Sequence, residues 1–346
     1  MAAYFFLFSP PALLALIDSK RTSWLKLSPL FIFFICFIGF RHKVGMDWNN
    51  YIAFGRTIAR YPLEDILFVS EPGFSILSWF SYDAGWSIYG INTFAAILFC
   101  YGLFSMCRIA KEPWLALVAA TPYLVIVVGM SATRQSIAIG IIFTLIAHWN
   151  NTRLISKIIW IFIASIFHLS ALFMLVLIIA ESQASFLKKL IYSILLTYGV
   201  VRILTDTGYY QYYSNAYLEV ESLAFYSEGA FAHVSLNAIP AMIYLFFRRP
   251  WNRLYGYNNL LYLLSVLSVM SLPLTFFWPT AVDRMALYYS GVPMIVLAGL
   301  PSLMKSGLTR PIVRLMIVFG YFSVLTIWLK YANSAHAYIP YKSLIF

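Results

Sequence analysis

Charged residues are scarce in this sequence. Only 11% of its 346 residues are Asp, Glu, Lys or Arg, against roughly 25% in soluble domains. So few charges cannot cover a water-facing surface of this size, which excludes an ordinary soluble protein. Apolar runs recur along the whole chain and no small-residue cleavage site stands out, so we expect no removable signal peptide.

Cysteines and familiar catalytic motifs are also few. The three cysteines, Cys36, Cys100 and Cys107, lie in or at the edge of apolar runs. Neither a disulfide framework nor a zinc site is predicted, and we expect no metal or cofactor. The sequence has no Walker A loop, no G-x-S-x-G elbow and no H-E-x-x-H motif. Nucleotide-driven chemistry is therefore disfavoured, and a preactivated lipid substrate that enters from the bilayer fits better.

Hydrophobic residues make up 62% of the chain, and its mean hydropathy is +0.79. A helix needs about 20 apolar residues to cross a bilayer. We predict an all-α, polytopic membrane protein, with a single transmembrane domain over residues 1–346. The predicted spans are 3–17, 28–40, 86–107, 113–130, 135–149, 189–204, 233–248, 257–277, 285–303 and 312–330.

The stretch 156–186 is too long for one tilted span, and His168 interrupts it. Two legs, 156–168 and 169–186, meeting near the outer face give about twelve crossings, and one long helix gives about eleven. The positive-inside rule favours two legs, because most of the 24 basic residues then lie in inner loops. The net charge of +11 is thus a topology signal, and nucleic acid is not an expected partner.

Two outer segments are long enough to matter. In the outer loop 41–85, the apolar stretch from Pro72 to Phe80 is too short to span, so we expect it to lie along the interface. The outer loop 205–232 is rich in Tyr and acids. These residues suit sugar hydroxyls and rings, although an interfacial aromatic belt explains the same pattern.

Two polar motifs at the outer ends of the predicted spans come early in the chain. Asp47 and Tyr51 are four residues apart and share a face if this piece is helical. Asp47 is either an N-cap or a catalytic or acceptor-orienting carboxylate. Arg134, followed by Gln135, stands at the N-terminal end of an apolar helix, where the macrodipole disfavours a cation. That placement favours a bound anion, and guanidinium matches phosphate well.

Two further motifs come later. His168 is either a structural histidine that bonds a neighbouring helix or a functional one at a helix break. Pro279 is expected to end one helix and Asp283 to cap the next, with Arg284 as a second cation at a helix N-terminus and Tyr288 one turn further. Two such arginines on one side suggest a diphosphate clamp. Charges at helix ends also occur simply as caps or snorkelling side chains.

These motifs, in this order over about residues 41–290, resemble the EpsG / Wzy family of bacterial polysaccharide (O-antigen) polymerases. The pattern is an arginine-bearing outer loop with G-x-D-x-x-x-Y, then R-Q-x-x-A, F-H-x-S-A and D-R-x-x-x-Y. Here it is formed by Gly45, Asp47, Tyr51, Arg134, Gln135, Ala138, Phe167, His168, Ser170, Ala171, Asp283, Arg284 and Tyr288.

The resemblance implies a glycosyltransferase at the periplasmic face of the bacterial inner membrane. It would join oligosaccharide repeat units carried on undecaprenyl diphosphate, most typically into O-antigen of lipopolysaccharide. The implied partners are this lipid-linked oligosaccharide, the bilayer and a chain-length regulator protein. Arg134 and Arg284 would stabilise the departing diphosphate. The candidates for base or orienting group are Asp47, His168 and Asp283, with Tyr51, Gln135 and Tyr288 in support.

The sequence leaves alternative residue roles and alternative functions open. His168 or Asp47 is our choice of base, and Asp283 our choice of orienter for Arg284. Capsule and exopolysaccharide polymerases would show the same features. A flippase for lipid-linked sugars would also need arginines, but within a cavity open alternately to both faces. A membrane acyltransferase would need a route for an inward-facing acyl donor, of which the sequence gives no sign.

Overall fold

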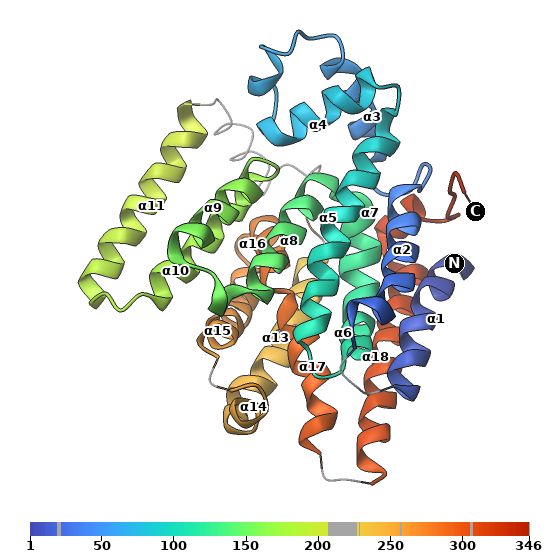
Figure 1. Cartoon of the computed structure of the whole chain (residues 1–346), viewed down its shortest axis with the longest axis vertical. Coiled ribbons are helices and arrows are strands. Elements are labelled where there is room, and N and C mark those ends of the chain that lie inside the picture. Colours follow the sequence, from blue (N-terminus) through green and yellow to red (C-terminus); the bar gives the residue numbers. More distant parts are fainter. Residues whose placement is uncertain (19–21, 207–226, 228, 257, 305–306, 346) are drawn as a thin grey trace. The chain divides into compact units, whose positions relative to one another are not determined.

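The computed structural model describes residues 1–18, 22–206, 227, 229–256, 258–304 and 307–345. Over these residues the chain is all-α and has no β-strand (Figure 1). Most of the predicted outer loop 205–232 lies outside the described residues. The chain divides into two compact units, which are described separately below.

The first unit contains Met1–Asn151, Ile163–Leu169 and Pro293–Phe346. Its complete helices are α1 (Ala2–Ile17), α2 (Trp24–Gly39), α3 (Trp48–Ile58), η1 (Ile66–Phe68), α4 (Pro72–Asp83), α5 (Ser87–Ile109), α6 (Pro113–Ala120), η2 (Thr121–Val128), α7 (Gly129–Ser131), α8 (Thr133–Ala147), η3 (Trp149–Asn151), α18 (Thr309–Tyr331) and η6 (Asn333–Ala337).

The second unit contains Thr152–Phe162 and Ser170–Val292. Its helices are α10 (Leu175–Glu181), α11 (Phe186–Asp206), α13 (Ala230–Phe246), α14 (Arg248–Tyr255), α15 (Asn259–Leu274), α16 (Pro279–Ala286) and η5 (Leu287–Tyr289). Three helices, α9 (Leu154–Ser165), η4 (Leu169–Met174) and α17 (Gly291–Leu303), have residues in both units.

Three helical stretches among the described residues are long and apolar enough to cross a membrane: α5, the run from α6 to α7, and α18. Two bent pairs, α13 with α14 and α16–η5 with α17, raise the number to five if each is one span. Six shorter apolar helices accompany them, and α11 is not among either group. The prediction of an all-α polytopic membrane protein is confirmed. The number of about eleven or twelve crossings stays a prediction.

Close backbone packing joins α5 to α8 in the first unit. A Cβ placed on Gly102 would lie 2.0 Å from the carbonyl oxygen of Gly140, and one on Gly140 would lie 2.3 Å from that of Leu98. Neither position therefore tolerates a side chain, and the two backbones touch directly, as small residues allow between membrane helices. This packing fixes the axis of α8 and hence the place of its first residues.

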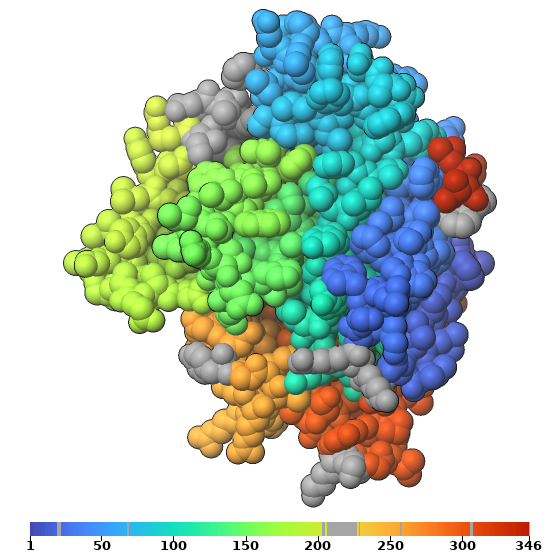
Figure 2. All heavy atoms as spheres, in the orientation of Figure 1, coloured from blue at the N-terminus to red at the C-terminus, as the bar shows by residue number. Residues whose placement is uncertain are grey.

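The C-terminal residues of the first unit pack against the end of α2 (Figures 1 and 2). Figure 2 shows them in red against the blue N-terminal helices. Three backbone N–H groups join this segment to the turn after α2: His42 donates to Lys342 at 2.8 Å, Gly45 to Ala337 at 2.9 Å, and Leu344 to Phe40 at 2.9 Å. The turn is thus held by the far end of the chain.

The predicted interruption at His168 is confirmed. Helix α9 ends at Ser165, and the 3₁₀-helix η4 begins at Leu169. In the second unit, Lys157 near the start of α9 and Glu181 at the end of α10 form an ion pair, with 3.1 Å from Nζ to Oε2. Because the two far ends meet, the legs run back alongside each other as a hairpin.

Candidate functional site

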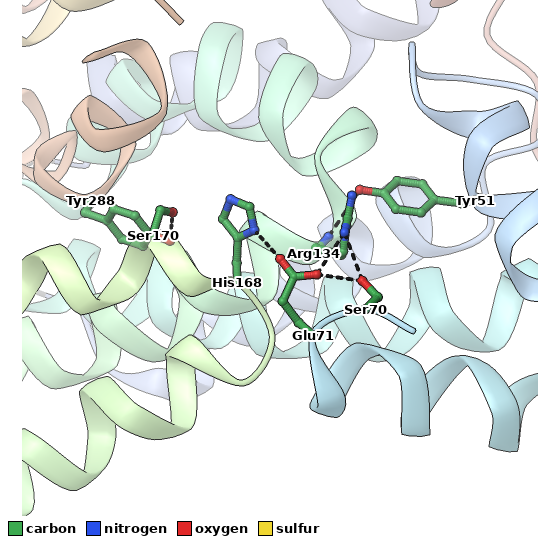
Figure 3. A network of polar contacts seen from close by, with 7 residues as sticks. All are labelled: Tyr51, Ser70, Glu71, Arg134, His168, Ser170 and Tyr288. Carbon is green, nitrogen blue, oxygen red and sulfur yellow. Dashed lines mark hydrogen bonds and ion pairs between the residues drawn. The ribbon is translucent and has the colours of Figure 1, made fainter. Parts of the chain in front are cut away.

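One buried carboxylate joins two of the predicted site residues in the first unit (Figure 3). Glu71 is 4% exposed. Its Oε2 accepts a hydrogen bond from Arg134 Nη1 at 2.8 Å and another from Ser70 Oγ at 2.7 Å. Its Oε1 lies 3.2 Å from Nδ1 of His168. Arg134 is 63 positions away in sequence and His168 is 97, so the fold alone brings them together.

The start of helix α4 positions Glu71 in this cluster. Glu71 occupies the N-cap position and Pro72 the first helical position, which suits proline because its missing N–H is not needed there. The N–H of Gly73 donates to the carbonyl oxygen of Ile166 at 2.9 Å. A Cβ on Gly73 would lie 3.0 Å from that same oxygen. The first turn of α4 therefore rests on the helix break that carries His168.

Arg134 is the second residue of α8, which confirms its predicted place at a helix N-terminus. Its side chain is 28% exposed. The guanidinium also lies 5.9 Å from the ring centroid of Tyr51 and 5.7 Å from that of Phe74, at the distance of cation–π contacts. Carboxylate and aromatic faces thus hold the cation in one place.

The motif of Gly45, Asp47 and Tyr51 lies at the start of α8. Gly45 has φ +105°, and a Cβ there would lie 2.1 Å from the carbonyl oxygen of Met130. The N–H of Asp47 donates to Ser131 Oγ at 3.4 Å, and the N–H of Arg134 donates to the Tyr51 hydroxyl at 3.5 Å. The first two sequence motifs are therefore parts of one local structure.

Asp47 is half-buried and stands at the N-cap position of α3, but its side chain makes no capping hydrogen bond. Tyr51 follows one turn later, and its N–H donates to the carbonyl oxygen of Asp47 at 3.0 Å. The two residues are four apart on a helix, as predicted. The capping role that competed with a functional one is not observed. Gln135, the predicted supporting residue next to Arg134, is buried within α8.

The Glu71 carboxyl is ionised at neutral pH. Burial raises its pKa, but the hydrogen bond with His168 and the charge of Arg134 lower it by more. With the hydrogen bond from Ser70, they hold the pKa of Glu71 well below its ordinary value. At the neighbouring Tyr51, burial and then the charge of Asp47 raise the pKa of the phenol.

This arrangement has two chemical abilities. A carboxylate that takes the Nδ1 proton of a histidine fixes its orientation and leaves Nε2 to accept a proton. A partly exposed arginine held at a helix N-terminus can stabilise a phosphate that develops charge. Glu71 supports both, because it holds His168 through one oxygen and Arg134 through the other.

The second unit carries the remaining predicted residues, and here three expectations are wrong. Asp283 does not cap a helix, because α16 begins at Pro279 with Trp278 in the N-cap position. Arg284 stands in the last turn of α16 rather than at a helix N-terminus. We expected Pro279 to end the preceding helix, but α15 already ends at Leu274. Proline instead takes the first helical position, where it is favoured.

Asp283 nevertheless belongs to a buried polar cluster. Its Oδ2 accepts a hydrogen bond from Ser227 Oγ at 2.6 Å and lies 3.2 Å from Nδ1 of His233. Tyr288 forms a 2.9 Å hydrogen bond with Ser170 Oγ, which joins the last two sequence motifs. Arg134 and Arg284 lie in different units, so the diphosphate clamp stays a prediction.

Neither Glu71 nor His233 was predicted as a site residue from the sequence. Glu71 has a recognisable signal: it is an acid directly before a proline at the start of an apolar segment, which is a helix start. His233 offered no comparable signal, because its partner Asp283 is 50 positions away.

Apolar helices long enough to cross a membrane, together with this arginine–carboxylate–histidine cluster, define an integral membrane protein with a buried polar cluster. The chain belongs to the EpsG family, whose model matches residues 25–343, nearly its whole length. This family points to a polysaccharide polymerase-like role in polysaccharide biosynthesis. No curated protein and no solved structure matches the chain.

Proposed function

We propose that this protein is a Wzy-type polymerase. It is a glycosyltransferase that joins undecaprenyl-diphosphate-linked oligosaccharide repeat units at the periplasmic face of the bacterial inner membrane. The observation that carries the proposal is the Glu71–Arg134–His168 cluster, in a chain that the EpsG family model covers almost completely. The polymer we propose is O-antigen of lipopolysaccharide, and a chain-length regulator protein is a proposed partner.

The reaction breaks the bond between the anomeric carbon of the growing chain and its diphosphate lipid. A hydroxyl at the non-reducing end of the next lipid-linked unit forms the new glycosidic bond and loses its proton. Undecaprenyl diphosphate leaves with the electron pair of the broken bond. Arg134 stabilises the negative charge that develops on this leaving group, by a charge-assisted contact in a site of low dielectric constant.

His168 accepts the proton of the attacking hydroxyl, and Glu71 orients its ring through Nδ1. Asp47 is the second candidate for the base, because it is half-buried on the first turn of the helix that carries Tyr51. Asp283, Arg284 and Tyr288 belong to the second unit, where Asp283 contacts His233.

A deletion strain complemented with variants tests this function. A strain without the polymerase should cap its lipid A core with a single repeat unit, whereas a strain without a flippase for lipid-linked sugars should add none. His168→Ala and Arg134→Met should restore no ladder. Glu64→Gln, an exposed acid in the same outer loop, should restore it fully. Full-length ladders in the deletion strain would contradict both the polymerase and the flippase.

A membrane assay separates the two candidate bases. Membranes with His168→Ala or Asp47→Asn receive the undecaprenyl-diphosphate-linked repeat unit, and chain lengthening is followed on gels. We expect a loss of about 10²-fold or more for the variant that removes the base. If each of these variants kept full chain-lengthening activity, both assignments would be wrong.

A further inference from the structure

Arg41 is almost completely buried in the first unit, with 2% of its surface exposed. It directly follows Phe40, the C-cap of α2. Its Nη1 donates to the carbonyl oxygen of Ile38 at 2.7 Å, and its Nε to that of Val44 at 3.3 Å. Its Nη2 donates to Asn92 Oδ1 at 2.9 Å and to Thr133 Oγ1 at 3.0 Å. Every acceptor is a neutral oxygen.

The charge of Arg41 is not balanced by an acid among the residues that the structure describes. Burial lowers the pKa of its guanidinium to about 10, so it remains protonated at neutral pH. A buried cation without a counter-ion is costly. Arg314 shows the usual solution in the same unit: its Nε and Nη2 donate to the two carboxylate oxygens of Glu112 at 2.7 and 2.9 Å. The unbalanced charge of Arg41 thus calls for a reason beyond its hydrogen bonds.

Beside these neutral acceptors lies one donor that no hydrogen bond uses. The amide nitrogen of Asn92 is buried and makes no hydrogen bond, while its oxygen serves Arg41. Thr133, which also accepts a hydrogen bond from Arg41, is the first residue of α8. At this end of the helix the dipole adds positive potential. A buried group of donors at a positive helix end favours negative charge nearby.

Arg41 is linked to the candidate site in two ways. Thr133 directly precedes Arg134, so the hydrogen bond from Arg41 holds the backbone that presents the guanidinium of Arg134. Its Nε also donates to Val44, which directly precedes Gly45 in the motif of Asp47 and Tyr51. The Tyr51 hydroxyl in turn accepts the hydrogen bond from the Arg134 N–H.

We propose that Arg41 is a positioning residue for the diphosphate of the lipid-linked substrate. Its guanidinium fork ties the first residue of α8 to α5 and to the turn after α2, which fixes Arg134. Its unbalanced charge adds to the positive potential that attracts the diphosphate. This inference rests on the proposed function, because it assumes the same diphosphate ligand.

Three variants separate the role of the planar guanidinium hydrogen bonds of Arg41 from the role of its positive charge. Arg41→Lys keeps the charge and loses the planar fork, whereas Arg41→Met loses both at similar length. Thr133→Val keeps the charge and removes one acceptor. The protein in membranes is assayed for binding of undecaprenyl diphosphate alone, and for KM and kcat with the lipid-linked repeat unit.

We expect Arg41→Met to weaken undecaprenyl diphosphate binding about tenfold, and Arg41→Lys to recover most of that affinity. Both Arg41→Lys and Thr133→Val should lower kcat about tenfold with KM little changed, because Arg134 is no longer held. Added salt should reduce the difference in affinity between Arg41→Met and the native protein. A merely structural role would make Lys and Met equally harmful to affinity.

Arg314→Met is the matched control. It removes another arginine of the first unit, one whose side chain is 15% exposed, and should lower stability without changing lipid affinity. Native affinity and kcat in Arg41→Lys together with Thr133→Val would overturn the inference, even if Arg41→Met failed to fold. If Arg134→Met lost activity while Arg41→Met kept native affinity and kcat, only the inference would fail. If both variants were fully active, the proposed function would fail as well.

Discussion

The sharpest test of the site is Glu71→Gln. The substitution keeps the shape of the side chain and removes only its charge. Glu71 is 4% exposed and contacts Arg134 at 2.8 Å and His168 at 3.2 Å. A neutral amide would leave both partners without their anion. The variant therefore probes the one group on which the proposed base and the proposed diphosphate ligand both depend.

The expected magnitude follows from these contacts. A hydrogen bond to a charged group contributes about 1.5–3 kcal/mol, and breaking a fully buried ion pair costs about 3–5 kcal/mol. The Arg134 side chain is 28% exposed, so water takes over part of the lost interaction. We expect a stability loss of about 2 kcal/mol. We expect a loss in chain-lengthening rate of about 10²-fold, because His168 loses its orienting acceptor.

The assay compares membranes with equal amounts of native protein, Glu71→Gln and the exposed-site control Glu64→Gln. Chain lengthening is measured from the lipid-linked repeat unit, and stability from thermal unfolding in the same detergent. The control should match the native protein in both. Native activity of Glu71→Gln would refute the shared role of this carboxylate. A loss of stability alone would reduce Glu71 to a structural ion pair.

Three further outcomes follow from the same structure. Below about pH 4, stability that the depressed pKa of Glu71 supplies at higher pH should be lost, so unfolding free energies of the native protein and Glu71→Gln should converge as the pH falls. Gly45→Ala should destabilise by about 2 kcal/mol or more in thermal unfolding, because φ is +105° and Met130 O blocks the Cβ. Gly85→Ala, with φ +77° and open space, should show only the smaller backbone strain. Asp283→Asn should lower kcat about tenfold in the membrane assay, because its hold on His233 weakens.

Composition and the length of apolar runs predicted the all-α membrane class and part of the candidate spans. The predicted span 113–130 corresponds to the run Pro113–Ser131, because a long apolar stretch between polar ends has few alternatives in a bilayer. The break at His168 was predictable for the same reason, since the stretch was too long for one span. These features depend only on residues that are contiguous in the chain, so they could be predicted without knowing the fold.

The failures arose where a local signal had two meanings or where none existed. Proline both ends one helix and opens the next, and Pro279 was assigned to the wrong one. The expected helix positions of Asp283 and Arg284 were wrong for the same reason. Glu71 was missed because its importance comes from partners 63 and 97 positions away, which no local pattern contains.

The charge balance of the first unit argues for the kind of ligand that its site takes. Glu71 is one carboxylate shared between Arg134 and His168, while Arg41 adds a buried charge held only by neutral oxygens. Even with His168 neutral, two guanidinium groups lie around the positive end of α8, and Arg41 contacts no carboxylate among the described residues. A site for uncharged sugar alone would gain nothing from this excess, because burying an unbalanced cation is costly. A diphosphate removes the imbalance on binding and develops more negative charge as the glycosyl bond breaks, so the same excess is better used in the transition state than in the free protein.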